Sequence, residues 1–543
     1  MHGPVVGGVL SKPPQRGCES RRRALRVLFV WLNHDTPVGF SHGLAVLSAE
    51  LKAAGHSVEL LHVNEQLGLP FDLASIGQEL TRRRPDVVGL SFGSNHAAAA
   101  AQVAASVRRL LPDCWVMAGG AHTTLYPEQV MSWPDVDIAA LGEVDDFRLV
   151  EMLEALERDR LPHGRAGFWF RERGGLVKGS LVKNAIGLPV DLGRSGPMDL
   201  ELFDHQRILQ LKRGWADVQG GRGCPQRCSY CFNEPLRRRY LDELQCGSGR
   251  KLNYVRKRPI AVVIEELEQY RRLYGPHIRV FSFTDDQFVT NRRWVYEFLE
   301  EYRTKFQIPL VLLSSAGAID AEVAERFARA GVYMVRMGVE SGSARVREVI
   351  LHRKTPAGII RRAVRTLQSA GVNAFAFQML GIPGETMRDV WATFRFGARL
   401  RTDALKFSNF WPYPGTELYQ HCLREGLVRP GLEFVGNNIV DSPLRWPLAR
   451  QLLFRRLPRF YDVALNRFLD ERNAGRYTDV LDRLRNLPEA SWQNGGQREL
   501  RQQADAINQR VISEGGEAYL APFEDRPDVL LLQSTHRSRP LLV

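Results

Sequence analysis

Three of the seven cysteines of this 543-residue chain lie within eight residues, at Cys224, Cys228 and Cys231. An odd and small number of cysteines does not suit a disulfide framework, so a close group of three indicates metal or redox chemistry in a reducing compartment. Three thiolates on one short loop can hold three corners of a cubane iron–sulfur cluster and leave the fourth iron open. The spacing therefore predicts a cluster whose open iron can bind and polarise another molecule.

Zinc is the plainer alternative for such a group. A structural zinc ion normally has four ligands, commonly from two CxxC-like pairs. Cys246 or a distant histidine could be a fourth ligand, but the sequence has no second CxxC pair. The remaining cysteines stand alone and are expected to be ordinary thiols: Cys18, Cys114, Cys246 and Cys422.

Six stretches with the pattern of buried parallel strands surround the cysteines, with amphipathic segments between them. Short apolar runs that end in small or polar residues are typical of strands in a parallel sheet. About six such strand–helix units predict an open or partial barrel, with chemistry at the carboxyl ends of its strands. The cysteines directly follow the first strand. The strands are expected at residues 215–221, 279–285, 310–315, 333–339, 374–380 and 404–410.

An earlier alternating series, from residue 26 to residue 157, predicts a doubly wound parallel sheet. Ligands of such sheets sit beyond the carboxyl ends of the strands. Glycines there can bring the backbone close to a bulky ligand, or they can only make tight turns, and both interpretations stay open. Small and polar residues gather at these strand ends: Ser91, Gly119, Gly120, Gly142 and Glu143.

Changes in composition divide the chain into five segments of an α/β protein. We expect a disordered tail at 1–24, the doubly wound domain at 25–160 and a linker with a small hairpin at 161–205. The barrel domain is expected at 206–430. Residues 431–543 are Arg-rich and helical in pattern, with loops over the last thirty residues.

The net charge of +13 raises the question of nucleic-acid binding. The Arg-rich stretches are short, scattered and without interleaved aromatic residues, so they favour solvated helix faces. No run reaches the about 18 apolar residues of a membrane-spanning helix, and the N-terminus lacks the apolar core of a signal peptide. We therefore expect a cytoplasmic protein without a nucleic-acid or membrane partner.

The segment CPQRCSYC, residues 224–231, resembles the CxxxCxxC motif of the radical S-adenosylmethionine (SAM) enzymes. Tyr230 takes the place of the aromatic residue that precedes the third cysteine of that motif. Its position after the first strand of a barrel-like series strengthens the resemblance. What this implies is a [4Fe–4S] cluster held by Cys224, Cys228 and Cys231, with SAM bound at its open iron.

Other strand ends resemble further motifs of the same superfamily. Asp285 and Asp286 resemble an acidic pair that accepts hydrogen bonds from the ammonium group of the substrate, and either could also cap a helix. Glu340 and Ser341 resemble the segment that meets the ribose and methionine part of SAM. Gly381 resembles the turn that lies beside the adenine.

A doubly wound domain before a radical module is similar to the cobalamin-binding domain of one large branch. In that branch, segments like 118–128 and 141–146 shape the pocket for the corrin and its nucleotide tail. The DxHxxG motif of many cobalamin proteins is absent, because His34 precedes Asp35 and no glycine follows at the required spacing. Cobalt is therefore expected to lack an axial histidine, with His122 as the open alternative. The resemblance implies cobalamin contacts from Ser91, Gly119, Gly120, His122, Gly142 and Glu143.

The resemblance implies a reaction with two cofactors. Reduction of SAM at the cluster yields a 5′-deoxyadenosyl radical, which removes hydrogen from a carbon that no base could deprotonate. The substrate radical takes a methyl group from methylcobalamin, and a second SAM remethylates the cobalt. The leading hypothesis is a methyltransferase acting on carbon or phosphorus of a small-molecule or carrier-protein-bound intermediate, as in antibiotic biosynthesis. An electron donor such as flavodoxin or ferredoxin is implied.

Two other functions stay open. A radical cyclase or rearrangement enzyme of secondary metabolism would use the same cofactors, and the product mass would distinguish it from a methyltransferase. A cluster-containing sensor or RNA-binding protein would bind SAM without cleaving it, or bind nucleic acid in a salt-dependent way. Residues 431–543 are expected to cover the barrel mouth or help to form the substrate pocket. The sequence identifies no general acid or base.

Overall fold

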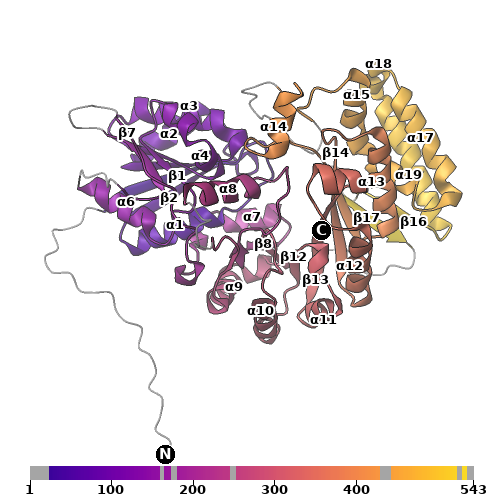
Figure 1. Cartoon of the computed structure of the whole chain (residues 1–543), viewed down its shortest axis with the longest axis horizontal. Helices are drawn as coiled ribbons and strands as arrows, with labels where there is room; N and C mark the ends of the chain where they lie inside the picture. The colour runs from indigo at the N-terminus through magenta and orange to yellow at the C-terminus, as the bar shows by residue number, and fades with distance from the viewer. Residues whose placement is uncertain are drawn as a thin grey trace, which may run out of the picture.

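The computed structural model describes residues 24–158, 164–172, 180–244, 252–428, 442–521 and 529–534. Two α/β domains lie side by side, and a helical region lies against the second domain, on the side away from the first (Figure 1). Nearly all of the expected tail at 1–24 falls outside the described residues, as do Cys18 and Cys246.

The N-terminal domain is a seven-stranded sheet in the order β2-β1-β3-β4-β5-β6-β7. Its first five strands are parallel: β1 (Arg26–Leu32), β2 (Ser57–Val63), β3 (Val87–Ser91), β4 (Trp115–Gly119) and β5 (Ile138–Ala140). The chain reverses its direction of strand addition between β1 and β3, the place where such sheets bind ligands. The structure confirms the doubly wound parallel sheet.

Helices connect these strands and begin where the sequence supplies a cap. Ser41 accepts a hydrogen bond from the backbone N–H of Leu44 at the start of α1, and Asp72 accepts one from Ser75 at the start of α2. Buried apolar residues on one side of each helix face the sheet. The helices are α1 (His42–Ala53), α2 (Leu73–Arg83), α3 (Ala97–Leu110), α4 (Ala121–Leu125), α5 (Pro127–Ser132) and α6 (Arg148–Glu157).

The hairpin expected between residues 161 and 205 extends this sheet. β6 (Phe168–Arg171) pairs antiparallel with β5, and β7 (Leu181–Lys183) pairs with β6. Three neighbouring residues of β6, from Phe168 to Phe170, are buried. The hairpin therefore packs as part of the first domain, with apolar side chains in its core.

The second domain is built on an eight-stranded sheet in the order β16-β17-β15-β14-β13-β12-β11-β8. β8 stands at one edge, so the six parallel strands form an open barrel, as the sequence predicts. These strands are β8 (Trp215–Val218), β11 (Val280–Phe283), β12 (Leu310–Leu313), β13 (Val332–Glu340), β14 (Asn373–Leu380) and β15 (Ala404–Asn409). The main helices are α9 (Ile260–Tyr274), α10 (Arg292–Lys305), α11 (Ala321–Arg329), α12 (Ala357–Ser369) and α13 (Met387–Leu400).

The expectation of loops over the last thirty residues is wrong in part. β16 (Glu517–Leu520) and β17 (Val529–Ser534) form an antiparallel pair, and β17 also pairs antiparallel with β15. The run from Val529 to Leu532 is apolar and buried. It covers the edge of the barrel sheet, which would otherwise expose unpaired backbone groups.

The helical prediction for the C-terminal region is confirmed by α15 (Leu448–Arg456), α16 (Tyr461–Asn466), α17 (Ala474–Asn486) and α19 (Gln497–Ser513). The Tyr461 ring lies 4.7 Å from the Phe407 ring of β15. The region thus packs on the barrel largely through apolar and aromatic side chains. None of the helices in the described part of the chain has the length and apolar character needed to cross a bilayer.

Candidate active site

The cysteine loop leaves the barrel at the carboxyl end of β8. The expected first strand, 215–221, stops at Val218, and Gly221–Arg222 forms a separate short strand, β9, paired antiparallel with β10 (Arg256–Lys257). Gly223 follows with φ of 87°, and a Cβ there would lie 2.2 Å from the carbonyl oxygen of Tyr254. Only glycine fits this position, because the backbone conformation and the close approach both exclude a side chain.

The three thiols of the loop suit a cluster. None of them forms a disulfide, and Cys224 and Cys228 are buried. Burial, followed by the charges of neighbouring groups, raises the pKa of Cys224 to about 12 and that of Cys231 to about 11. Cys228 and Cys231 both add to the shift of Cys224, and Cys228 adds to that of Cys231, as expected for thiols on one short loop. Such thiols give up their protons only to a strongly bound cation.

Their arrangement differs from that around a single ion. Among the described residues, no group of three His, Cys, Asp or Glu side chains could hold one metal ion. In a cubane cluster each thiolate binds a different iron. The three thiols of one loop therefore fit a cluster by their chemistry and their placement on the chain.

Arg353, a residue that the sequence analysis missed, reaches the cysteine loop from the segment after β13. Its Nη1 lies 3.7 Å from Cys228 Sγ and 3.4 Å from the Tyr230 hydroxyl oxygen. Its Nη2 donates to the carbonyl of Gly338, 2.6 Å away. On the other side of the loop, Asn233 Nδ2 lies 3.8 Å from Cys231 Sγ. Donors thus face two of the three sulfurs, where they can stabilise negative charge.

The structure separates the two aspartates. Asp285 is buried, accepts a hydrogen bond from the Gly220 N–H at 2.6 Å and pairs with Lys257 at 2.7 Å. Asp286 instead accepts from Asn233 Nδ2 at 3.0 Å, beside the cysteine loop, and burial followed by the charge of Asp285 raises its pKa. Neither caps the next helix, since Asn291 caps α10. Asp285 therefore anchors the loop entrance, and Asp286 is the aspartate beside the cysteines.

The side chains of Glu340 and Ser341 also have different neighbours. Glu340 ends β13 with φ of 64°, hydrogen-bonds with Tyr230 and lies 3.9 Å from Arg353 Nη1. Its pKa is raised by burial. The Ser341 hydroxyl is fully buried, 3.1 Å from that of Thr393 on α13, and accepts from the backbone N–H of Ser343. Glu340 thus joins the group around the cysteines, whereas the hydroxyl of Ser341 stabilises a turn.

Gly381 begins the turn after β14. Its N–H and that of Ile382 donate to Glu385 Oε2, at 2.8 and 3.2 Å. Burial raises the pKa of Glu385 to about 8. Arg450 of α15 donates to the backbone carbonyl of Glu385 at 2.9 Å. The C-terminal region therefore reaches the carboxyl end of β14, which is the end of the barrel that it is expected to cover.

A cavity of about 270 Å³ opens at the carboxyl ends of the N-terminal strands. Apolar side chains from β1, β4 and α1 form much of its wall, and Arg222 of β9 lines it from the barrel domain. Gly120, with φ of 99°, is required by packing, since a Cβ would lie 2.6 Å from the Phe92 carbonyl oxygen. A Cβ on Gly119 would meet nothing closer than 3.8 Å, so that glycine leaves space in the cavity. Five expected cobalamin contacts line it: Ser91, Gly119, Gly120, Gly142 and Glu143.

The side chain of His122 contacts other groups. Its Nδ1 is 3.0 Å from the hydroxyl of Ser94, and its ring stands near those of Phe92 and Tyr126. Burial lowers its pKa to about 4, so the imidazole is neutral at physiological pH. His122 is not among the described residues that line the cavity.

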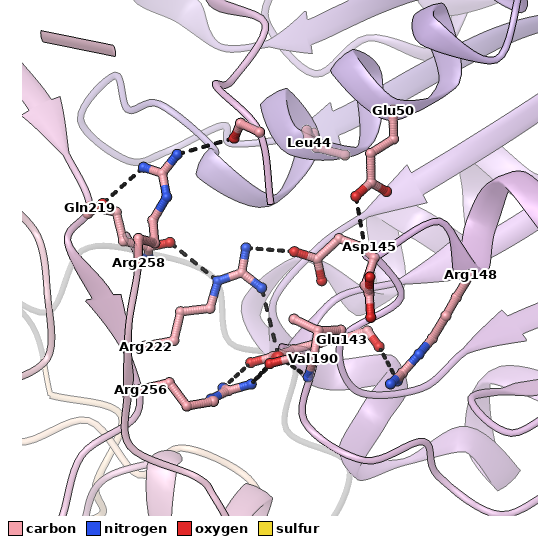
Figure 2. Close-up of polar contacts among 12 residues, drawn as sticks. Leu44, Glu50, Glu143, Asp145, Arg148, Val190, Gln219, Arg222, Arg256 and Arg258 are labelled. Carbon is pink, nitrogen blue, oxygen red and sulfur yellow. Dashed lines mark hydrogen bonds and ion pairs between the residues drawn. The ribbon is translucent and has the colours of Figure 1, made fainter. Parts of the chain in front are cut away.

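The cavity and the cysteine loop meet at a group of buried charges (Figure 2). Glu143 forms two contacts of 2.7 Å with Arg256 and accepts from the backbone N–H of Val190 at 2.9 Å. Asp145 pairs with Arg222 at 2.8 Å. The arginines, which the sequence analysis missed, stand opposite each other in the β9–β10 pair. The carboxylate of Glu143 is therefore bound by the barrel domain.

Comparison with known proteins agrees with this geometry. Residues 218–397 match the model of the radical SAM superfamily, and residues 35–149 match that of the B12 binding domain. The chain is a radical SAM enzyme. Its N-terminal domain places it among the cobalamin-dependent members, whose cofactors are a [4Fe–4S] cluster, SAM and cobalamin. The zinc and sensor interpretations are set aside by this match.

Two similar curated proteins are named as methyltransferases. An uncharacterized methyltransferase of Pyrococcus horikoshii is 28% identical over 71% of this chain and 79% of its own length. Cytidylyl-2-hydroxyethylphosphonate methyltransferase of Streptomyces wedmorensis is 24% identical over 77% of this chain and 85% of its own length. An anaerobic magnesium-protoporphyrin IX monomethyl ester cyclase of Cereibacter sphaeroides is 23% identical over 73% of this chain and 63% of its own length.

Solved structures share the fold at lower identity. The radical SAM methyltransferase TsrM from Kitasatospora setae, with cobalamin and a [4Fe–4S] cluster bound, has a TM-score of 0.58 and 19% identity. That match covers 78% of this chain and 80% of TsrM. The cobalamin-dependent radical enzyme OxsB has a TM-score of 0.62 and 15% identity, over 91% of this chain and 76% of OxsB.

Proposed function

We propose that the protein is a radical methyltransferase that moves a methyl group from methylcobalamin to carbon or phosphorus of a small-molecule or carrier-bound intermediate. The observation that carries this proposal is the direct contact between the two cofactor regions. Arg222, two residues before Cys224, lines the cavity of the N-terminal domain and pairs with Asp145. A methyl donor held by the N-terminal domain would stand next to the radical site.

The cofactors carry the difficult chemistry: reduction of SAM at the cluster supplies a carbon radical, and cobalamin supplies the methyl group. The chain holds and orients them. Cys224, Cys228 and Cys231 would hold the cluster, with Arg353 and Asn233 stabilising the charge on two of the sulfurs.

SAM would be held by groups around the same loop. Asp286 accepts from Asn233 Nδ2 and from the backbone N–H of Gly223, and the remaining lone pairs of its carboxylate can accept from an ammonium group. Glu340, near Tyr230 and Arg353, can accept from ribose hydroxyls. Gly381 leaves room beside the turn that Glu385 closes, which suits a flat base. Burial of these groups keeps water away from a radical.

The cavity of the N-terminal domain is proposed as part of the cobalamin site. Ser91, Gly119, Gly120 and Gly142 supply a wall of small side chains, and the apolar residues opposite suit a planar base. Its volume suits a nucleotide tail better than the whole cofactor.

A cyclase is the second candidate, and it is supported by similarity to the magnesium-protoporphyrin IX monomethyl ester cyclases. Such an enzyme would use the same cofactor regions and differ in the fate of the substrate radical. The residues that choose between the two outcomes belong to the substrate site. In either case a one-electron donor, such as flavodoxin or ferredoxin, is proposed as the partner that reduces the cluster.

Anaerobic reconstitution with iron, sulfide and cobalamin, followed by reaction with reduced flavodoxin as the electron donor, tests the proposal. With SAM carrying a trideuterated methyl group, the enzyme should form labelled methylcobalamin, S-adenosylhomocysteine and 5′-deoxyadenosine. Cytidylyl-2-hydroxyethylphosphonate and magnesium-protoporphyrin IX monomethyl ester serve as the two probe substrates. A gain of one labelled methyl group by the phosphonate supports methyl transfer.

The Cys228→Ala variant is the control, because it should lose 5′-deoxyadenosine formation while retaining cobalamin. Turnover in that variant would rule out the radical mechanism. Formation of 5′-deoxyadenosine without S-adenosylhomocysteine or labelled methylcobalamin would instead rule out methyl transfer and favour the cyclase.

A further inference from the structure

The short β9–β10 pair carries two arginines toward the cobalamin-binding domain. Arg222 and Arg256 are register partners in this pair. Arg222 is separated from Cys224 by a single residue, Gly223. Any movement of this pair therefore moves the start of the cysteine loop.

Two carboxylates from one segment of the N-terminal domain bind these arginines. Glu143 takes both terminal nitrogens of Arg256, each at 2.7 Å, and its carboxylate lies 3.7 Å from Arg222 Nη1. Asp145 binds Arg222 Nη2 at 2.8 Å. Figure 2 shows the Arg222 side chain between Asp145 and Glu143. We name these four residues the charged strut.

The charged strut is balanced in charge and largely withdrawn from solvent. Two guanidinium groups face two carboxylates; the side chains of Arg256 and Asp145 are each 5% exposed, that of Arg222 is 16% exposed and that of Glu143 is 22% exposed. Bidentate pairs between arginine and carboxylate are directional, so they fix orientation as well as distance. Arg256 also donates to the Val190 carbonyl at 2.7 Å, which ties in the segment between the two domains.

The far end of the cysteine loop is anchored to the same segment. α8 (Asn233–Glu243) begins two residues after Cys231. Its Tyr240 hydroxyl accepts from the backbone N–H of Glu143 at 3.2 Å. A Cβ on Gly142 would lie 2.4 Å from that hydroxyl oxygen, so glycine is required for this contact. The cysteine loop is thus held before its first cysteine and after its last one by residues 142–145.

Residues 142–145 also line the cavity of the N-terminal domain. One segment therefore contacts both the cobalamin side and the cluster side. We propose that the charged strut of Glu143, Asp145, Arg222 and Arg256 sets the distance and orientation between cobalt and the iron–sulfur cluster. In this assignment Glu143 acts as a positioning residue, bound to Arg256, and its carboxylate is not free to hold cobalamin. The inference rests on the cofactor set and holds for a methyltransferase or a cyclase.

The test is the distance between the two cofactors in the holoenzyme. Cob(II)alamin and the reduced cluster are both paramagnetic, so pulsed electron paramagnetic resonance reports the distance between them. Arg256→Gln should shift or broaden this distance distribution at unchanged iron and cobalamin content. Arg256→Lys keeps the charge but loses the bidentate geometry, and it should give an intermediate distribution. A displacement of about 1 Å can reduce the rate of product formation about 100-fold.

Arg501→Gln is the matched control. It breaks the buried pair of Arg501 with Asp462, at 2.7 Å in the C-terminal region, and should leave the distribution unchanged. Should Arg256→Gln fold poorly, the double variant Glu143→Gln/Arg256→Gln removes both charges together and is measured in its place. A distribution like that of the unmodified protein, with both cofactors bound, would overturn the inference. If Arg256→Gln shifts the distance distribution as predicted but the unmodified enzyme transfers no methyl group, only the proposed function is contradicted.

Discussion

The barrel domain has a neighbour on each side, and the two contacts use different chemistry. Toward the cobalamin-binding domain it presents arginines that bind carboxylates, as in the Arg256–Glu143 pair. Toward the C-terminal region it presents an edge strand and aromatic rings, as in the contact of Phe407 with Tyr461. Apolar contacts stabilise without fixing direction, whereas bidentate ion pairs fix both distance and direction. The polar contact therefore lies where two cofactors must be aligned.

The largest effect, on iron content, is expected from Gly223→Ala, on the side of the barrel domain that faces the cobalamin-binding domain. A Cβ there would lie 2.2 Å from the Tyr254 carbonyl oxygen, and the positive φ alone costs about 1–3 kcal/mol. The cysteine loop should lose its shape and most of its iron, measured as iron and sulfide content after anaerobic reconstitution. Gly371→Ala is the control, with φ of 80° and no atom within 4 Å of its Cβ. Equal iron loss in both would show that the contact with Tyr254 is unimportant.

On the apolar side, Leu530→Ala should cost stability and leave the cofactors in place. Leu530 is fully buried in β17, and removing such a side chain costs about 2–5 kcal/mol. The midpoint of urea unfolding should fall, with iron and cobalamin content unchanged. Leu448→Ala, at a side chain that is 70% exposed, should change stability by less than about 0.5 kcal/mol. Loss of iron in folded Leu530→Ala protein would contradict the claim that the contact with the C-terminal region affects stability and not the cofactors.

Arg353→Gln tests whether the reduction potential of the cluster depends on a nearby charge that takes no part in the contact between the two domains. Without the cation 3.7 Å from Cys228 Sγ, the reduced cluster loses a stabilising donor and its reduction potential should fall. A lost hydrogen bond of about 1.4 kcal/mol corresponds to about 60 mV for one electron. A redox titration followed by electron paramagnetic resonance measures the potential. Arg345→Gln, at an exposed ion pair with Asp389, is the control; a shift of equal size there would argue against a local effect.

The smallest effect concerns Glu50, which accepts hydrogen bonds from the backbone of Asp146 and Phe147, next to the charged strut. Burial raises its pKa from 4.5 to about 7. Between these values the unfolded chain has lost a proton that the folded chain keeps, so stability falls as pH rises through this window. Glu50→Gln should flatten this dependence by about 1 kcal/mol or less, after allowance for partial solvent screening. Urea unfolding at pH 5 and pH 7.5 measures it, and an unchanged slope would contradict the assignment.

Much of the fold could be predicted because its patterns are local. The six parallel strands and the helices between them are visible as apolar runs separated by amphipathic segments. The strands at 517–520 and 529–534 were missed because β17 gains its stability from the edge of β15, far away in the sequence. The apolar run of four residues from Val529 was a signal, but its partner could not be inferred from it.

In the site, too, residues on one short segment could be predicted and contacts between distant residues could not. The spacing of Cys224, Cys228 and Cys231 indicates their chemistry directly, since the ligands lie on one loop. The partners of Glu143 could not be found in this way, because Arg256 is 113 residues further along the chain and faces it only in the folded protein. Arg353 was missed for the same reason, although its place after the GVESGS segment put it near the fourth strand end. Pairs that join two domains leave no local pattern.

The covering of β15 by β17 has a consequence for how the chain is made. Ribosomes synthesise about 5–20 residues per second, so the stretch from Asn409 to Val529 takes roughly 6–24 s. Throughout that interval β15 can pair with β14 on one side while its other edge stays unpaired, and this edge is a template for strands of other nascent chains. Added chaperones that bind exposed strand edges should therefore raise the yield of dispersed protein.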